Sequence, residues 1–168
     1  MNSNFLINLL RFVILISFQV LVFNNIKLFG YIDPFPYVLF IILYPANSNK
    51  SILLLSSFFL GITLDLFSDT GGIHATACLI LAFIRPYIFK FAFGLSYEYQ
   101  TIKISEKVSS ERIVFVFIAV FIHHFIIYTL ELFRFGLSID ILVRPLLNAV
   151  FTSIICILSL YLIKPSRQ

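Results

Sequence analysis

Two carboxylates and a histidine lie within one short stretch of the chain, at Asp65, Asp69 and His74. Carboxylate oxygens and imidazole nitrogens are common metal ligands, but this spacing matches no established metal signature. Asp65 and Asp69 are four residues apart and share one helix face if the helix continues that far. The sequence predicts no metal and no cofactor here. We expect these groups, together with Gly72, to shape a tight turn between two helices or to contact a partner.

A second group of titratable residues lies further along the chain. His123 and His124 are adjacent, and Tyr128 and Glu131 fall on the helix face of His124. This pattern is typical of neutral histidines packed between helices. A proton relay is the alternative, but it lacks a second carboxylate at the same depth.

An outer polar cluster is predicted around the last interhelical loop. Asn148 and Thr152 would extend it as an inward polar seam along the final helix. We expect a partner's membrane helix or extracellular stem to dock there. Its members are Glu131, Arg134, Asp140, Arg144 and Asn148.

Catalytic signatures are missing from the sequence. It contains no G-x-S-x-G, no H-E-x-x-H and no glycine-rich phosphate loop. The expectation is therefore a protein that is not an enzyme.

The composition is that of a membrane protein. Of 168 residues, 60% are hydrophobic and 12% are charged, and the mean hydropathy is +1.02. Soluble domains carry about 25% charged residues, so the excess apolar surface here must face lipid. A net charge of +4 does not suggest nucleic acid. Cys78 and Cys156 lie inside apolar runs and are expected to be buried thiols.

The apolar runs predict an all-α, polytopic bundle of about six transmembrane helices in one domain, 1–168. The runs lack the alternation of a membrane barrel, and lipid-exposed backbone must satisfy its own hydrogen bonds. The run 34–45 is short, so it is tilted, re-entrant or partly inserted. Arg85-Pro86 is expected to interrupt the fourth run. The predicted segments are 6–23, 34–45, 52–67, 72–93, 113–133 and 145–163.

The basic residues predict the orientation, because cytoplasmic loops are enriched in lysine and arginine. With six crossings and a cytoplasmic N-terminus, only Lys27, Arg134 and Arg144 lie outside, against nine basic residues inside. Both termini are then cytoplasmic, unless 34–45 fails to cross. The loop 95–112 is either a docking loop for a cytoplasmic partner or anionic lipid, or a solvated interfacial helix.

The stretch between Gly61 and Tyr87 resembles the central signature of the MreD family of rod shape-determining proteins, its Bacteroidetes members in particular. A glycine is followed after three positions by an acidic residue, then a short turn, Gly-x-His and Arg-Pro-Tyr. Chain length and helix number fit the same family. The signature positions are Gly61, Asp65, Asp69, Gly72, His74, Arg85 and Pro86.

The resemblance implies a role and no activity. MreD is a multi-pass protein of the bacterial inner membrane that associates with MreC. With MreB, RodA and a class B penicillin-binding protein, it supports lateral peptidoglycan synthesis and rod shape. The resemblance assigns no catalytic residue and leaves self-association open.

Two other classes of protein stay open. MreD is similar in fold to the substrate-binding components of energy-coupling-factor vitamin transporters, which are six-helix bundles with an outward cavity. Those often dock their partner through small residues on the first helix, whereas segment 6–23 here has no alanine. The third class is a membrane enzyme acting on lipid-linked wall precursors, which would need a metal held by an outward carboxylate cluster.

Overall fold

The computed structural model describes residues 3–27, 30, 32–45, 48–94, 109–135 and 143–162. Five helices in these ranges are long and apolar enough to cross a membrane. At a rise of about 1.5 Å per residue, a helix of roughly 20 residues spans the hydrocarbon layer. These helices are α1 (Ser3–Leu21), α3 (Lys50–Ser68), α4 (Ile73–Phe93), α6 (Ser110–Phe135) and α7 (Val143–Leu162).

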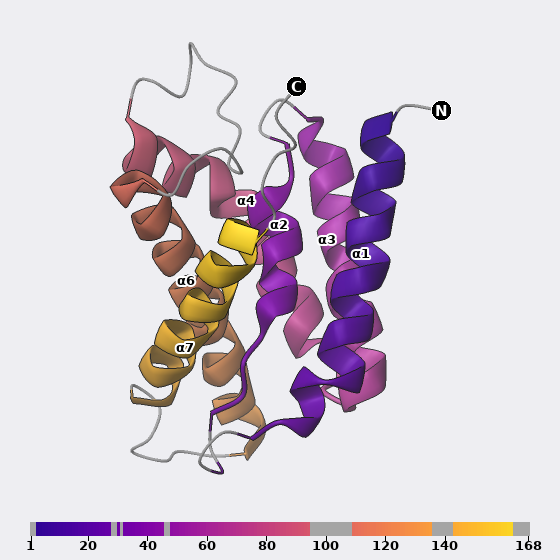
Figure 1. Cartoon of the computed structure of the whole chain (residues 1–168). Helices are drawn as coiled ribbons and strands as arrows, with labels where there is room; N and C mark the ends of the chain where they lie inside the picture. The colour runs from indigo at the N-terminus through magenta and orange to yellow at the C-terminus, as the bar shows by residue number, and fades with distance from the viewer. Residues whose placement is uncertain are drawn as a thin grey trace.

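The long helices form one bundle, in which α1 and α3 run in the same direction and α4, α6 and α7 then alternate in direction (Figure 1). The turn η1 (Phe23–Asn25), which follows α1, contacts the end of α3, where Asn24 Nδ2 donates to Ser68 Oγ over 3.2 Å. α4 pairs with α3 on one side and with α6 on the other, and α7 packs on α6. Each long helix therefore returns the chain toward the end of the bundle from which the preceding segment came.

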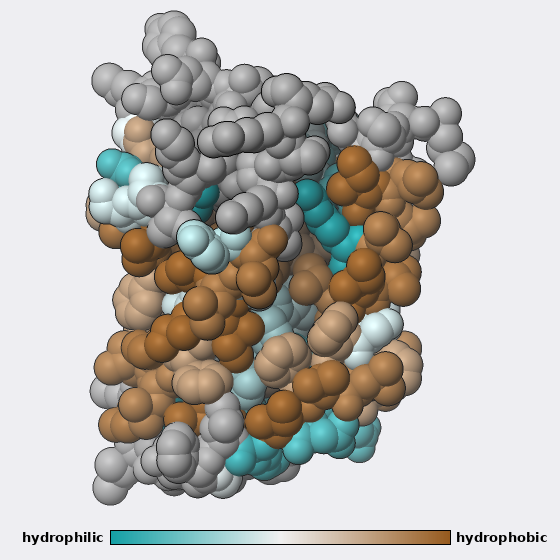
Figure 2. All heavy atoms as spheres, in the orientation of Figure 1, coloured by the Kyte–Doolittle hydropathy of each residue, from teal (hydrophilic) through white to brown (hydrophobic). Residues whose placement is uncertain are grey.

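Lipid-type surface covers the middle of the bundle. Brown, hydrophobic side chains dominate the visible face in Figure 2, while hydrophilic ones gather toward its ends. α1 buries only Ile16 and Gln19 among residues 6–21, so most of this helix faces outward. Phe67 and Leu66 on α3 are 63% and 80% exposed. Exposed aromatic and aliphatic side chains in this number are unusual on a soluble monomer and typical of a surface that faces lipid.

The segment between α1 and α3 runs through the interior of the bundle and is called here the inserted segment (residues 32–44). It has no regular secondary structure at residues 33–35, forms a 3-10 turn η2 (Pro36–Val38), and ends in the short helix α2 (Leu39–Leu43). All seven residues of 36–42 are buried, and the six from 37 to 42 are at most 3% exposed. The segment enters beside the end of α1 and leaves beside the start of α3 (Figure 1). The inserted segment is thus the hydrophobic centre around which the long helices are arranged.

Helices α3 and α4 approach each other closely at Gly61. A Cβ atom at this position would lie 2.5 Å from the Ala75 amide nitrogen and from the His74 carbonyl oxygen. Real Cβ contacts are never this short, so only glycine allows the two backbones to meet here. The glycine of the sequence signature therefore sets the spacing of the α3–α4 pair.

Over the described residues the all-helical prediction is confirmed, and the predicted segments match the helices closely. One detail of the prediction was wrong: Pro86 does not interrupt α4, which continues to Phe93. The condition for a shared helix face of Asp65 and Asp69 is not met, because α3 ends at Ser68 and Asp69 adopts a left-handed conformation with φ 52°.

Candidate functional site

Eight buried polar side chains lie in or around the inserted segment and are called here the interior polar network (Tyr37, Asp65, His74, Arg85, His123, His124, Asn148 and Thr152). Each of these residues is at most 5% exposed. Burying a polar group without a partner costs about 1–3 kcal/mol in proteins, so the partners of each group explain why the network exists.

Asp65, on α3, caps the N-terminus of the next helix, α4. One carboxylate oxygen accepts the His74 N–H at 2.9 Å and the other accepts the Ala75 N–H at 2.8 Å. The Thr70 hydroxyl also donates to this carboxylate. Helix N-termini leave backbone N–H groups free and carry a positive partial charge, so a carboxylate is the favoured partner. Asp65 therefore ties the end of α3 to the start of α4.

The turn that Asp65 closes depends on glycine. Gly71 and Gly72 have φ values of 66° and 99°, in the region that L side chains rarely adopt. Gly72 begins α4 without any side-chain capping bond of its own. The expectation that residues 68–72 form a tight turn is confirmed. The capping side chain comes from inside α3, which the turn sequence does not reveal.

His74 and His123 meet across the inserted segment through one hydroxyl. Tyr37 Oη lies 2.6 Å from His74 Nδ1 and 3.0 Å from His123 Nε2. A phenol has one proton to donate. If it donates to His74, then His123 Nε2–H donates to Tyr37, and the unpaired atom His123 Nδ1 is an acceptor instead of a stranded N–H. This arrangement keeps all three groups neutral.

His124 has its tautomer fixed by its neighbours. Its Nδ1 lies 2.9 Å from the Val120 carbonyl, which can only accept, so Nδ1 carries the proton. Its Nε2 then accepts from the Thr152 hydroxyl at 3.2 Å. Thr152 Oγ1 in turn accepts the Phe35 N–H at 3.2 Å. A neutral histidine thus holds the backbone of the inserted segment through one threonine.

The non-helical part of the inserted segment has its backbone hydrogen bonds supplied by side chains from two long helices. Asn148 on α7 accepts the Asp33 N–H at 2.5 Å and donates to the Arg144 carbonyl at 2.8 Å. Gln19 on α1 donates to the Pro34 carbonyl at 3.3 Å. Non-helical backbone at membrane depth is stable only where protein groups replace the missing helical hydrogen bonds. The predicted polar seam of Asn148 and Thr152 therefore faces inward and supplies those bonds.

Arg85 holds the other end of the inserted segment. Its guanidinium donates to the carbonyls of Ile42, at 3.3 Å, and Tyr44. It also lies over the Phe89 ring, 5.5 Å from the centroid. The last carbonyls of a helix have no partner within it, and a cation is favoured there. Arg85 is therefore the C-terminal cap of α2.

Some of the predicted site residues lie together in the structure, and others lie apart. Asp65, Gly72 and His74 act together at one turn, Gly61 lies behind them, and Arg85 acts at the opposite end of the inserted segment. Asp69 is exposed, and Pro86 is half-buried within α4. The prediction of histidines packed between helices is confirmed for His123 and His124.

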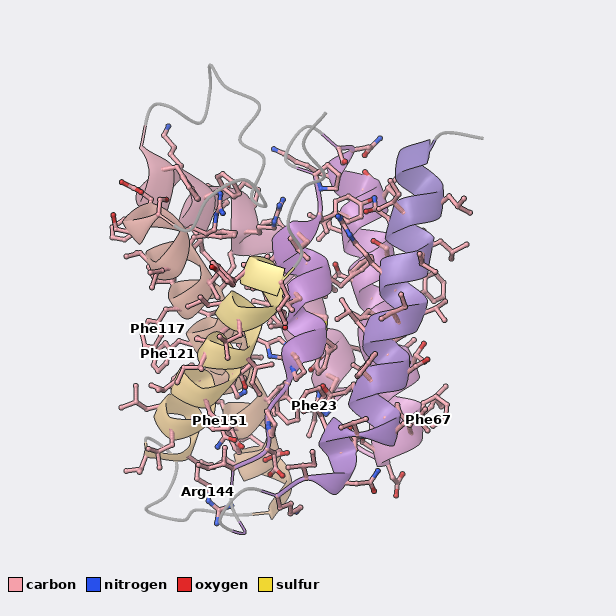
Figure 3. All side chains as sticks on the ribbon, viewed as in Figure 1. Phe23, Phe67, Phe117, Phe121, Arg144 and Phe151 are labelled. Atoms are coloured by element: carbon pink, nitrogen blue, oxygen red, sulfur yellow. The ribbon has the colours of Figure 1, made fainter. Side chains whose placement is uncertain are left out.

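The outer polar cluster is only partly described. Asn148 is buried and accepts the Asp33 N–H, whereas Arg144 is exposed at the end of the bundle opposite the start of α1 (Figure 3). Glu131 is half-buried within electrostatic range of Asp33 and Arg144. Asp140, the side chain of Arg134 and the loop residues 95–108 lie outside the described residues.

Sequence reasoning missed Tyr37 of the network, and also Gln19, which donates to the Pro34 carbonyl. Tyr37 stands in a run of apolar residues and reads as a core aromatic. A polar side chain at the middle of an apolar run was the available signal, because such groups need a partner at membrane depth. Gln19 carried the same signal in the first run.

Comparisons with protein-family models, with curated proteins and with solved structures give no significant match to this chain.

Proposed function

We propose that this chain is a non-catalytic membrane scaffold of the MreD type, which supports lateral peptidoglycan synthesis through association with an MreC partner. The observation that carries the proposal is the structural role of the signature residues. Asp65, His74 and Arg85 have their side chains turned into the bundle, where they hold backbone and one another. Residues used in this way build a rigid shape, and a rigid shape is what a scaffold offers its partners.

The filled space between the histidines favours the scaffold over a vitamin-binding component. A small-molecule site needs a concave space of several hundred Å³ lined by a few convergent polar groups. In the described part of the chain, Phe35 and Tyr37 occupy the space between the histidines. The Phe35 ring stacks on the His124 ring with 5.1 Å between their centroids, and its centroid lies 5.2 Å from that of the His74 ring. A ligand placed between these histidines would have to displace the inserted segment itself.

The proposed setting is the bacterial cytoplasmic membrane, with six crossings. Arg11, Lys50, Lys90 and Arg112 lie at the end of the bundle where α1 begins, and Lys27 and Arg144 lie at the other end. The positive-inside rule then orients α1 with its start in the cytoplasm. The turn at 69–72 and the exposed Arg144 face outward, toward the extracellular part of a partner.

Co-purification with a defined partner tests the proposal. The tagged chain and the MreC protein of the same genome are co-expressed, solubilised in mild detergent and captured by the tag. We expect an MreC complex that withstands size-exclusion chromatography, and restoration of rod shape in cells depleted of their own MreD. Recovery of the chain with an energy-coupling ATPase module, and failure to retain MreC, would overturn the scaffold proposal.

A further inference from the structure

A second candidate site lies at the end of the α3–α4 pair, away from the interior polar network. A groove of about 290 Å³ opens between the start of α3 and the last turns of α4. Leu53 and Leu54 line it from α3, and Ala82 and Phe83 line it from α4. None of these residues takes part in the network. The groove is therefore free for a separate function.

The positive charge of this groove is concentrated at the end of the bundle where α1 begins. Lys50 is the first residue of α3, and Lys90 lies in the last turn of α4. Both lysines line the groove and both are exposed, beside Tyr87, which is 70% exposed. The apolar walls continue from this end into the lipid-facing belt. The groove thus presents two ammonium groups and a tyrosine at the membrane interface, and its apolar walls extend from them toward the middle of the bilayer.

The shape and charge of the groove identify its occupant. A helix about 10 Å in diameter is too wide to enter a groove of about 290 Å³, whereas a single acyl chain is narrow enough to lie in it. A soluble anion would use the lysines but not the apolar walls. Basic pockets between transmembrane helices at the cytoplasmic face are typical binding sites for anionic lipid headgroups.

We propose that the Lys50–Lys90 groove binds an anionic phospholipid, with the phosphate between the two ammonium groups and an acyl chain along Leu53, Leu54 and Ala82. The tyrosine hydroxyl of Tyr87 stands at the level of the headgroup, as interfacial tyrosines do. The inference depends on the chain being embedded in a bilayer and does not depend on the scaffold function.

Native mass spectrometry of the delipidated full chain in detergent tests the site. Dioleoyl-phosphatidylglycerol, dioleoyl-phosphatidylcholine and soluble glycerol 3-phosphate are added separately. The variant is the double substitution Lys50→Gln with Lys90→Gln, and the matched control is Lys27→Gln, an exposed lysine at the other end of the bundle. Wild type and control are expected to retain phosphatidylglycerol in preference to phosphatidylcholine. The double variant loses about thirty-fold in affinity, which corresponds to about 1 kcal/mol for each lysine.

A groove-filling variant tests the apolar half. Leu54→Trp keeps both lysines and occupies the channel, so it is expected to lower phosphatidylglycerol retention without loss of the folded monomer. Equal retention by the wild type and the double variant would overturn the proposal. Glycerol 3-phosphate binding as tightly as the lipid, or unchanged lipid retention in Leu54→Trp, would do so as well, because the site would then take an anion alone.

Discussion

Replacing Asp65 by asparagine removes a single acceptor from the junction between α3 and α4. The two side chains have nearly the same shape, so packing is preserved. The carboxylate accepts the His74 N–H on one oxygen and the Ala75 N–H on the other, and also the Thr70 hydroxyl. In asparagine, one oxygen becomes an NH₂ group, which cannot accept. One buried backbone N–H then faces another donor.

The size of the effect follows from two contributions. A buried donor left without a partner costs about 1–3 kcal/mol. Loss of the negative charge at the N-terminus of α4 costs about a further 1 kcal/mol in this buried geometry. Together they predict that the free energy of unfolding falls by about 2–4 kcal/mol. For a domain of this size, each kcal/mol lowers the melting temperature by about 2–4 °C, so we expect a drop of roughly 5–15 °C.

Thermal unfolding in detergent, followed by the loss of the monomer peak in size-exclusion chromatography, measures this shift. The matched control is Asp69→Asn, the same substitution four residues later at an exposed position. Asparagine tolerates the left-handed backbone of Asp69, where φ is 52°. We expect the control to shift by less than about 2 °C, within the usual range for surface substitutions. Equal shifts in the two variants would refute the assignment of Asp65 as the cap of α4.

Three further substitutions probe the other contacts by the same assay. Gly61→Ala should lower the free energy of unfolding by about 1–3 kcal/mol, because overlap with the backbone of α4 outweighs the better helix propensity of alanine. Tyr37→Phe deletes the hydroxyl between two buried histidines and should cost about 1–3 kcal/mol. Asn148→Leu removes the acceptor for the Asp33 N–H and should cost a similar amount, about 1–3 kcal/mol.

Each of these substitutions has a control of the same kind elsewhere in the chain. Thr63→Ala on α3, Tyr87→Phe on α4 and Val150→Leu on α7 alter residues that are exposed or half-exposed, and should leave the melting temperature almost unchanged. A neutral or stabilising Gly61→Ala would show that α3 and α4 are further apart than described. A Tyr37→Phe variant no less stable than Tyr87→Phe would contradict the shared hydroxyl.

Most of the fold could be predicted from hydropathy alone. Lipid removes the choice between helix and strand, so continuous apolar runs of about 20 residues become helices regardless of their phenylalanine and isoleucine content. The path of the inserted segment could not be predicted in this way. At Asp33–Phe35 the backbone is held by Gln19, Asn148 and Thr152, which are far away in sequence, and hydropathy carries no information about such pairings.

The residues of the candidate site could be predicted from the sequence better than the groups that each of them binds. Asp65, His74 and Arg85 stand out because ionisable groups are costly at membrane depth. Their roles depend on which backbone each one reaches: Asp65 reaches the next helix, and Arg85 reaches the carbonyls of Ile42 and Tyr44. The break expected at Pro86 did not occur, because neighbouring helices in a bundle stabilise a proline-containing helix.

The path of the inserted segment from one face of the membrane to the other is the central claim, and cysteine labelling tests it directly. Lys27→Cys and Lys50→Cys place single exposed thiols on either side of the segment, and the wild-type chain, with Cys78 and Cys156 buried, serves as the blank. A membrane-impermeant maleimide is applied to intact spheroplasts and to inverted vesicles. We predict that residue 27 is labelled only in spheroplasts and residue 50 only in inverted vesicles. Labelling of both positions from the same side would contradict a segment that crosses the bundle.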